Sequence, residues 1–175
     1  MPLIAMTGTP GTGKTSAAER LRQRGYEIID LNAFIAENGL LGEEDTERDT
    51  REVDIDSMRT VFSRRDKLSA IVEGHLSHFL GCDIVVVFRC HPDVLAGRLR
   101  ARGYSESKVR ENVQAEILDV ILCEADGSKA RVFEIDTTDL TPEETADKME
   151  DVIKGKGDHQ VPGSTDWSEE NEKWF

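Results

Sequence analysis

The chain has 175 residues, 38% of them hydrophobic and 33% charged, a composition typical of one soluble globular domain. Its formal net charge of −13 argues against non-specific binding to the phosphates of nucleic acids. The longest apolar run, Ile84–Phe88, is far shorter than the roughly 20 residues of a membrane helix, so we expect no membrane association.

Cysteine usage and the N-terminus predict a cytoplasmic protein. The three cysteines are odd in number and lack CxxC spacing, so we expect reduced thiols without zinc or disulfide roles. The first residues lack the basic region and cleavage pattern of a signal peptide. The acidity has two interpretations, solubility in a salt-rich cytoplasm or a basic partner protein, and the even spread of acids favours the first.

The first 25 residues combine a short apolar run, a glycine-rich stretch and a helical pattern. We expect residues 3–6 to form a buried strand and residues 13–24 a helix that stops at Gly25. Between them, Gly8–Thr15 reads GTPGTGKT and matches GxxxxGK(S/T) in the strand–loop–helix context that this motif requires. The alternative, a chance glycine-rich turn, is disfavoured because both spacing and context fit.

Each residue type in this stretch has a physical reason to bind phosphate. Glycines such as Gly11 and Gly13 let the backbone N–H groups wrap around an anion, and the following helix adds its positive end. Lys14 can reach the β- and γ-phosphates, the Thr15 hydroxyl can ligate Mg²⁺, and Ser16 can donate to the α-phosphate. The stretch therefore predicts a P-loop that binds a nucleoside triphosphate with Mg²⁺.

The next segment predicts a strand, a short helix and an acidic insert. Residues 26–30 are expected as the second strand and residues 31–39 as the helix. Asp30 closes the strand at the edge where open α/β sheets bind ligands. Residues 43–56 are charged and poorly periodic, which predicts a mobile loop or a small helical insert.

The motif VEGHLSH, residues 72–78, ends the third expected strand, 69–74. An acid at the end of a core strand beside the P-loop strand suits Mg²⁺ or its water shell, which makes Glu73 the candidate acid. His75 can position a water or orient phosphate, whereas the alternative for His75 and His78 is capping or packing. The acid–Gly–His context favours function for His75 and packing for His78.

The remaining elements continue the alternation of strands and helices. Strands are expected at 83–88 and 131–136, and helices at 55–67, 91–103, 105–125 and 140–155. Thr141, Pro142 and Glu144 predict a capping box with proline in the first turn of the last helix. This order predicts an α/β fold, a three-layer sandwich with a five-stranded parallel sheet of the P-loop NTPase type.

Arginines concentrate on the helix expected at 91–103. Phosphoryl transfer spreads negative charge over the equatorial oxygens, and mobile arginines neutralise this charge when a lid closes. The alternative, a solvated basic face, is disfavoured in so acidic a chain. We predict phosphate contacts from Arg102 and Arg98, and Arg89 is a weaker candidate.

The C-terminal segment differs in composition from the preceding domain, residues 1–157. Residues 158–175 are polar but contain two tryptophans and a final phenylalanine. Polar termini are disordered by default, so we expect a flexible tail. The alternative is a peptide that docks on a protein.

Three motifs, TGTPGTGKT, VEGHLSH and RLRARGYSESKVRENVQAEI, together resemble the small archaeal and eukaryotic adenylate kinases of the isoenzyme-six type. These are P-loop nucleoside monophosphate kinases that also act as ATPases in small-ribosomal-subunit maturation. The resemblance covers nearly all of residues 1–155 in the order of elements. The first motif is generic to P-loop proteins and the third is much more specific. The family often has aspartate where this chain has Glu73, whose longer side chain can act through a water.

The resemblance implies roles for two segments and two residues. Residues from about 30 to 53 correspond to the acceptor-nucleotide insert and about 101–111 to a short lid. Arg102 matches the ATP-contacting arginine, and His75 matches the histidine linked to catalysis and ATP hydrolysis. Family members bind a platform protein of the small ribosomal subunit, a basic partner that suits an acidic chain. The cations near the insert that could hold an acceptor phosphate are Arg48, Arg51 and Arg59.

The expected function is reversible transfer of the γ-phosphate of ATP·Mg²⁺ to AMP, with ATPase activity and a role in ribosome maturation. Lys14, Thr15 and Arg102 would neutralise charge in the transition state. One alternative is a ribosome-assembly ATPase with little kinase activity, in which Glu73 and His75 serve a water. Another is a P-loop kinase for a different small metabolite. A GTPase is disfavoured because no Asn-Lys-x-Asp motif is present.

Overall fold

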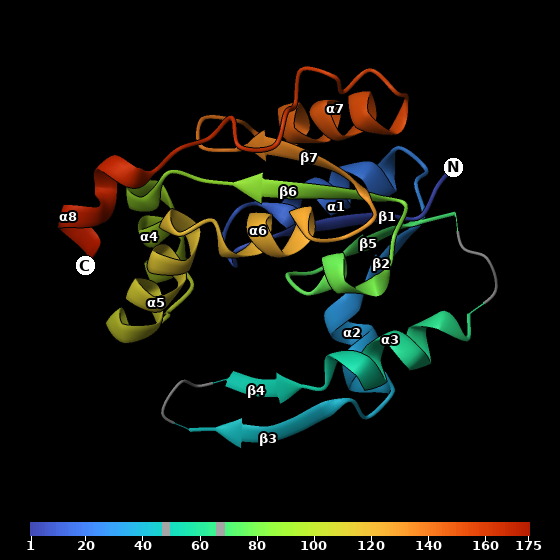
Figure 1. Cartoon of the computed structure of the whole chain (residues 1–175), viewed down its shortest axis with the longest axis horizontal. Helices are drawn as coiled ribbons and strands as arrows, with labels where there is room; N and C mark the ends of the chain where they lie inside the picture. The colour runs from blue at the N-terminus through green and yellow to red at the C-terminus, as the bar shows by residue number, and fades with distance from the viewer. Residues whose placement is uncertain (47–49, 66–68) are drawn as a thin grey trace.

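The computed structural model describes residues 1–46, 50–65 and 69–175, and every structural statement below concerns these residues. Five parallel strands form the central sheet (Figure 1). Their spatial order is β2 (Ile28–Asp30), β5 (Ile71–Glu73), β1 (Ile4–Gly8), β6 (Ile84–Arg89) and β7 (Arg131–Asp136). The five predicted strands are confirmed, and the apolar runs of β1 and β6 are buried, as expected for the centre of a parallel sheet.

The register brings the carboxyl ends of neighbouring strands together. Met6 of β1 lies opposite Glu73 of β5, and Glu73 in turn lies opposite Asp30 of β2. Gly8, the first residue of the P-loop, pairs with Phe88 of β6. Because all five strands are parallel, the loops that follow them meet at one edge of the sheet.

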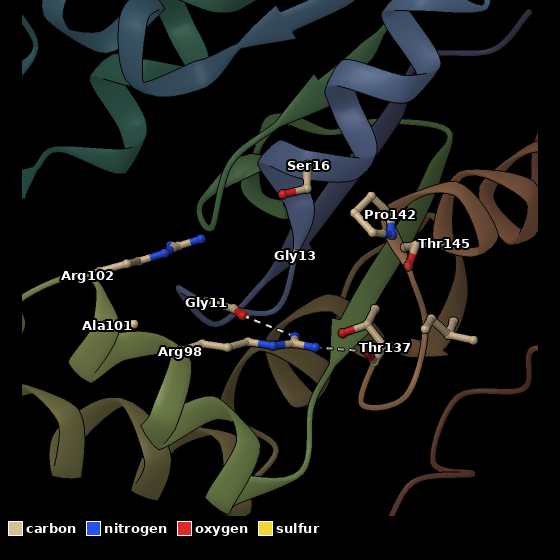
Figure 2. A pocket seen from close by; sticks show the side chains of 10 residues that line it. Gly11, Gly13, Ser16, Arg98, Ala101, Arg102, Thr137, Pro142 and Thr145 are labelled. Carbon is tan, nitrogen blue, oxygen red and sulfur yellow. Dashed lines mark hydrogen bonds between the residues drawn. The ribbon is translucent and has the colours of Figure 1, made fainter.

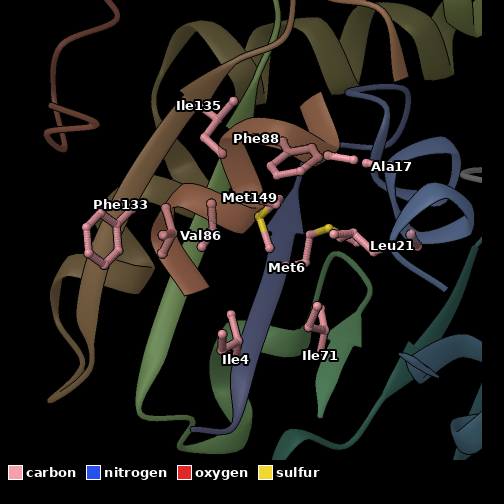
Figure 3. Close-up of a cluster of buried hydrophobic side chains, with 13 residues drawn as sticks. Ile4, Met6, Ala17, Leu21, Ile71, Val86, Phe88, Phe133, Ile135 and Met149 are labelled. Atoms are coloured by element: carbon pink, nitrogen blue, oxygen red, sulfur yellow. The ribbon is translucent and has the colours of Figure 1, made fainter. Parts of the chain in front are cut away.

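Helices cover both faces of the sheet, which confirms the predicted three-layer sandwich. On one face, α1 (Lys14–Gln23) and α7 (Pro142–Ile153) pack onto the strands; Figure 3 shows Leu21 and Met149 beside Met6 and Phe88. Each large aliphatic side chain buried there contributes about 1.5–3 kcal/mol. The other face is covered by α2 (Leu31–Glu37), α3 (Ile55–Ser63), η1 (Ser77–Leu80) and α6 (Val120–Asp126).

Two helices form a hairpin beyond the carboxyl end of β6. These are α4 (Pro92–Ala101) and α5 (Glu106–Ile117), and they enclose a separate apolar cluster. Gly103, with φ of 81°, ends α4, and Ser105 caps α5 by accepting from the backbone N–H of Lys108. The hairpin holds the C-terminal turn of α4 close to the P-loop.

The prediction of one long helix over residues 105–125 is wrong, because the structure has two helices there, α5 and α6. Asp119 lies between them with φ of 54°, a left-handed conformation that breaks the helix. Arg89 at the end of β6 pairs with the Asp119 carboxylate and donates from Nη2 to the Glu116 carbonyl oxygen at 3.0 Å. These tertiary contacts stabilise a break that the continuous apolar periodicity does not reveal.

The acidic insert is also not the loop or small helix that its charge predicts. β3 (Leu41–Asp45) and β4 (Thr50–Val53) pair antiparallel in a two-stranded sheet that projects from the domain (Figure 1). Glu44 and Arg51 lie opposite each other, with 3.9 Å between their charged groups. The two strands are therefore stabilised by backbone hydrogen bonds and this cross-strand ion pair, although their sequences lack the apolar alternation from which strands are predicted.

The C-terminal segment, expected to be flexible, lies against the α4–α5 hairpin and contains η2 (Ser168–Glu170) and α8 (Asn171–Trp174) (Figure 1). Trp167 and Trp174 pack onto the apolar cluster of the hairpin. Gln114 Nε2 donates to the Trp174 carbonyl oxygen at 2.8 Å, and Lys173 Nζ lies 2.6 Å from an Asp93 carboxylate oxygen. Burial of the two indole rings favours docking of the segment, although its polar composition predicts a flexible tail.

No helix within the described ranges has both the length and the apolar character needed to cross a membrane.

Candidate active site

The P-loop connects β1 to α1 through three glycines in left-handed conformations. Gly8, Gly11 and Gly13 have φ values of 141°, 93° and 96°. At Gly11 a Cβ atom would lie only 2.9 Å from Leu95 Cδ1, so both the backbone conformation and the packing of α4 require glycine. The loop thus keeps its shape without side chains at the points where the backbone turns.

Lys14 lies inside the P-loop and is 7% exposed. Its Nζ donates to the carbonyl oxygens of Gly8 at 2.6 Å and Thr9 at 3.0 Å. Burial lowers the pKa of Lys14 to about 8, while the charges of Glu73 and Glu116 oppose this fall. The ammonium group therefore remains largely protonated at neutral pH.

Thr15 and Glu73 bring two oxygen groups together beside the loop. Thr15 Oγ1 donates to Glu73 Oε1 at 3.4 Å, and Glu73 is 7% exposed. Burial raises the pKa of Glu73, and the nearby Lys14 charge works against this rise. Hydroxyl and carboxylate oxygens are the ligands that Mg²⁺ prefers, and one or two protein ligands suffice beside phosphates and waters. The pair therefore fits a magnesium ion.

The two histidines of the VEGHLSH motif have different surroundings. His75 lines the same pocket as Lys14 and Glu73, and burial lowers its pKa to about 4, so the ring is neutral at pH 7. His78 Nδ1 lies 3.0 Å from Thr7 Oγ1 and its Nε2 lies 3.0 Å from a Glu124 carboxylate oxygen. His78 is thus held within the packing of the strand end, in agreement with the packing interpretation.

Arg98 and Arg102 approach the P-loop from the C-terminal turn of α4 (Figure 2). Arg98 Nη1 donates to the Gly11 carbonyl oxygen at 3.4 Å, and Nη2 donates to that of Thr137 at 3.2 Å. The exposed Arg102 lines the pockets on both sides of the loop. Arg100 instead pairs with Glu106 at 2.8 Å on the outer surface.

Two pockets adjoin at the P-loop and share Gly11, Gly13 and Arg102. The first has a volume of about 390 Å³ and is drawn in Figure 2. Its other lining residues are Ser16, Arg98, Ala101, Thr137, Leu140, Pro142 and Thr145. The second has a volume of about 190 Å³, and its other lining residues are Pro10, Lys14, Thr15, Asn32, Glu73, Gly74, His75 and Tyr104.

The structure brings all the principal predicted site residues to these two pockets, while the weaker candidates lie elsewhere. Arg89 is 1% exposed and pairs with buried acids rather than facing a pocket. Arg51 pairs with Glu44 on the hairpin, and Arg59 lines a separate cavity beside His78. Arg48 lies outside the described residues.

Sequence reasoning missed several lining residues. Asn32 lies in the first turn of α2, directly after the strand end at Asp30, and Tyr104 belongs to the RGY part of the third motif. Thr137 follows β7, and its hydroxyl donates to the Thr12 carbonyl oxygen at 2.7 Å. The signal that these residues share is their position just beyond a strand or at a helix turn on the P-loop edge.

Comparison with known proteins places these features in a family. Residues 4–119 match a family model described as an AAA domain. The chain is 45% identical to an Archaeoglobus fulgidus protein named "Putative adenylate kinase", over 97% of this chain and 94% of that protein. Proteins of the same name from Thermococcus gammatolerans and Methanocaldococcus jannaschii are 46% and 40% identical, each over 95% of this chain and 93% of the relative.

Solved structures show the same fold at low identity. Shikimate kinase from Acinetobacter baumannii aligns with a TM-score of 0.62 at 19% identity, covering 89% of this chain and 94% of that one. Deoxyadenosine kinase from M. mycoides aligns with a TM-score of 0.57 at 15% identity, covering 87% and 99%. The chain therefore has a P-loop kinase fold, carries an AAA domain and belongs with its archaeal relatives to a family of adenylate-kinase-like proteins.

Proposed function

We propose that the protein is a nucleoside monophosphate kinase that reversibly transfers the γ-phosphate of ATP to AMP. The observation that carries this proposal is the pair of pockets that meet at the P-loop and share Arg102. One pocket suits a donor nucleotide and the other suits the phosphate being transferred. The names of the archaeal relatives support adenine nucleotides as the substrates.

The donor would lie in the larger pocket and extend along the P-loop. The base and ribose would occupy the space of about 390 Å³ between α4 and the start of α7. Ser16 would donate to the α-phosphate, and Lys14 would contact the β- and γ-phosphates. Arg98 already donates to the Gly11 carbonyl oxygen and would also contact a phosphate.

Thr15 and Glu73 would hold the Mg²⁺ that accompanies ATP, because their oxygens are already adjacent. When bound there, the ion would neutralise part of the negative charge of the nucleotide phosphates. Glu73 also lowers the cost of keeping Lys14 charged in a buried loop. Both residues therefore prepare the site for a highly charged nucleotide.

The acceptor would approach through the smaller pocket, between Asn32 on α2 and Tyr104 on the α4–α5 turn. Phosphoryl transfer requires little covalent chemistry from the protein, so positioning and charge neutralisation supply most of the catalysis. Arg102 is exposed on the segment proposed as the lid, 101–111, and would move onto the transferring phosphate when the lid closes. Neutral His75 would orient a phosphate oxygen by a hydrogen bond.

A second candidate activity is ATP hydrolysis, which the environment of His75 supports. A neutral imidazole and a carboxylate line one pocket with Lys14, an arrangement that can orient a water toward the γ-phosphate. The resemblance to isoenzyme-six kinases connects such hydrolysis with small-ribosomal-subunit maturation. A basic platform ribosomal protein would also complement a chain with a net charge of −13.

ADP formation from ATP·Mg²⁺, measured with and without AMP, tests the two activities. We expect strong acceleration by AMP and a loss of about a hundredfold or more in Lys14→Ala, which removes a charge from the transition state. Lys154→Ala is the matched control, because Lys154 lies on the surface and pairs with Glu150. Equal rates with and without AMP, changed by the purified platform protein, would instead make hydrolysis the main activity.

A further inference from the structure

A buried carboxylate on α5 connects the P-loop to two other parts of the fold. Glu116 is 3% exposed. Its Oε2 accepts from Thr9 Oγ1 at 2.6 Å. Its Oε1 accepts from Arg89 Nε at 2.8 Å, from the backbone N–H of Cys90 at 3.1 Å and from Trp167 Nε1 at 3.4 Å. One carboxylate thus joins the P-loop, the end of β6 and the C-terminal segment.

Thr9 connects Glu116 to other residues of the P-loop. While its hydroxyl donates to Glu116, its carbonyl oxygen accepts from Thr12 Oγ1 at 2.8 Å and from Lys14 Nζ at 3.0 Å. The first half of the loop is therefore fixed on one side by α5 and on the other by the ammonium group that meets the phosphates. A shift at Thr9 would move the carbonyl oxygen that holds Lys14.

We propose that Glu116 is a positioning residue that sets the P-loop, and with it Lys14, in the conformation that binds nucleotide. The proposed lid, 101–111, includes the first turns of α5, so the same contact ties the P-loop to the helix hairpin that carries Arg98 and Arg102. The inference rests on nucleotide binding at the P-loop, which the proposed function requires, and is independent of the acceptor.

The competing explanation is that Glu116 serves only the buried cluster around Arg89. Arg89 also pairs with Glu134, at 3.1 Å, and with Asp119. Glu134 is buried in the same cluster, and its carboxylate also accepts from the backbone N–H groups of Gly163 and Thr165 in the C-terminal segment. Glu134→Gln therefore perturbs the same ion cluster without touching the P-loop and is the matched control.

The test measures ADP·Mg²⁺ affinity by calorimetry in the full chain. We expect Glu116→Gln to weaken binding by about tenfold, the size expected for a lost charge-assisted hydrogen bond. Glu134→Gln should keep the wild-type affinity even where it lowers stability. Thr9→Val, which leaves the ion cluster intact, should weaken binding, and Thr9→Ser, which keeps the hydroxyl that donates to Glu116, should bind like the wild type.

Equal losses of affinity in Glu116→Gln and Glu134→Gln would overturn the proposal and leave Glu116 a purely structural role. If Glu116→Gln does not fold, Thr9→Val decides, because wild-type affinity in that variant also overturns it. Affinity is read without any acceptor present, so a failure of AMP phosphorylation does not affect this result.

Discussion

At the scale of single residues, the site depends on charged and polar groups whose environments change their ionisation. Burial lowers the pKa of Lys14 and raises that of Glu73, and each partly offsets the shift of the other. Burial and the nearby Lys14 charge keep His75 neutral. One pocket therefore combines two cations, Lys14 and Arg102, with the Glu73 carboxylate and a neutral imidazole.

The ionisation of His75 provides the first prediction. Its pKa of about 4 means that the ring should not titrate between about pH 5.5 and 8. Because an unfolded histidine takes up a proton near pH 6.5, His75 should also make stability fall as the pH drops from about 6.5 toward 4. NMR titration of the histidine ring protons, assigned with His75→Gln, checks this. A His75 midpoint near 6.5 would contradict it.

The P-loop glycines provide a second prediction, made with a matched pair of variants. Gly11→Ala and Gly13→Ala both place a side chain at positive φ, which costs about 1–2 kcal/mol. At Gly11 the added Cβ also meets Leu95 at 2.9 Å, whereas at Gly13 it meets nothing within 4 Å. Chemical unfolding should therefore show a larger loss of stability for Gly11→Ala. Equal losses of stability in the two variants would show that α4 moves to accommodate the added Cβ atom without a cost in stability.

At the scale of elements, the sequence predicts best where local signals and tertiary contacts agree. Each apolar run expected as a strand forms one, and α7 begins with the predicted capping box of Thr141 and Glu144. The break at Asp119 could not be predicted, because it depends on Arg89, some 30 residues earlier in the chain. The β3–β4 hairpin was missed for a similar reason, since backbone pairing between charged strands leaves no apolar period.

The candidate site follows the same pattern. The P-loop residues are adjacent in sequence and carry a motif, so their position was predictable. Asn32 and Thr137 reach the pockets only through the sheet topology, and no local signal distinguishes them from other polar residues after strands. Glu116 was visible only as part of a family-like motif, because its contacts with Thr9 and Arg89 join distant parts of the chain.

The C-terminal segment provides a prediction at this scale. Trp174 packs on the α4–α5 cluster, whereas Phe175 is 57% exposed. Trp174→Ala should reduce the free energy of unfolding by about 1–3 kcal/mol, less than the 3–5 kcal/mol of a fully buried tryptophan. Phe175→Ala should stay within about 0.5 kcal/mol of wild type. Similar small effects in both variants would indicate that the segment is not docked.

At the scale of the whole molecule, a parallel sheet gathers the loops that follow its strands at one edge, and the chain as a whole is strongly acidic. The net charge of −13 implies self-repulsion, which dissolved salt screens. The thermal midpoint should therefore rise as KCl increases from about 0.05 to about 0.5 M. Scanning calorimetry, with sucrose as an uncharged control solute, measures the effect. A constant or falling midpoint would show that repulsion among the acids is not significant.

The two adjoining pockets are proposed to transfer a phosphoryl group between nucleotides. The most direct test follows a radioactive label on the γ-phosphate of ATP in the presence of Mg²⁺ and AMP. The label should appear in ADP derived from AMP, with two ADP formed for each ATP consumed, and Lys14→Ala should reduce the transfer by about a hundredfold or more. Label found only in inorganic phosphate, at a rate that AMP does not change, would contradict phosphoryl transfer to AMP.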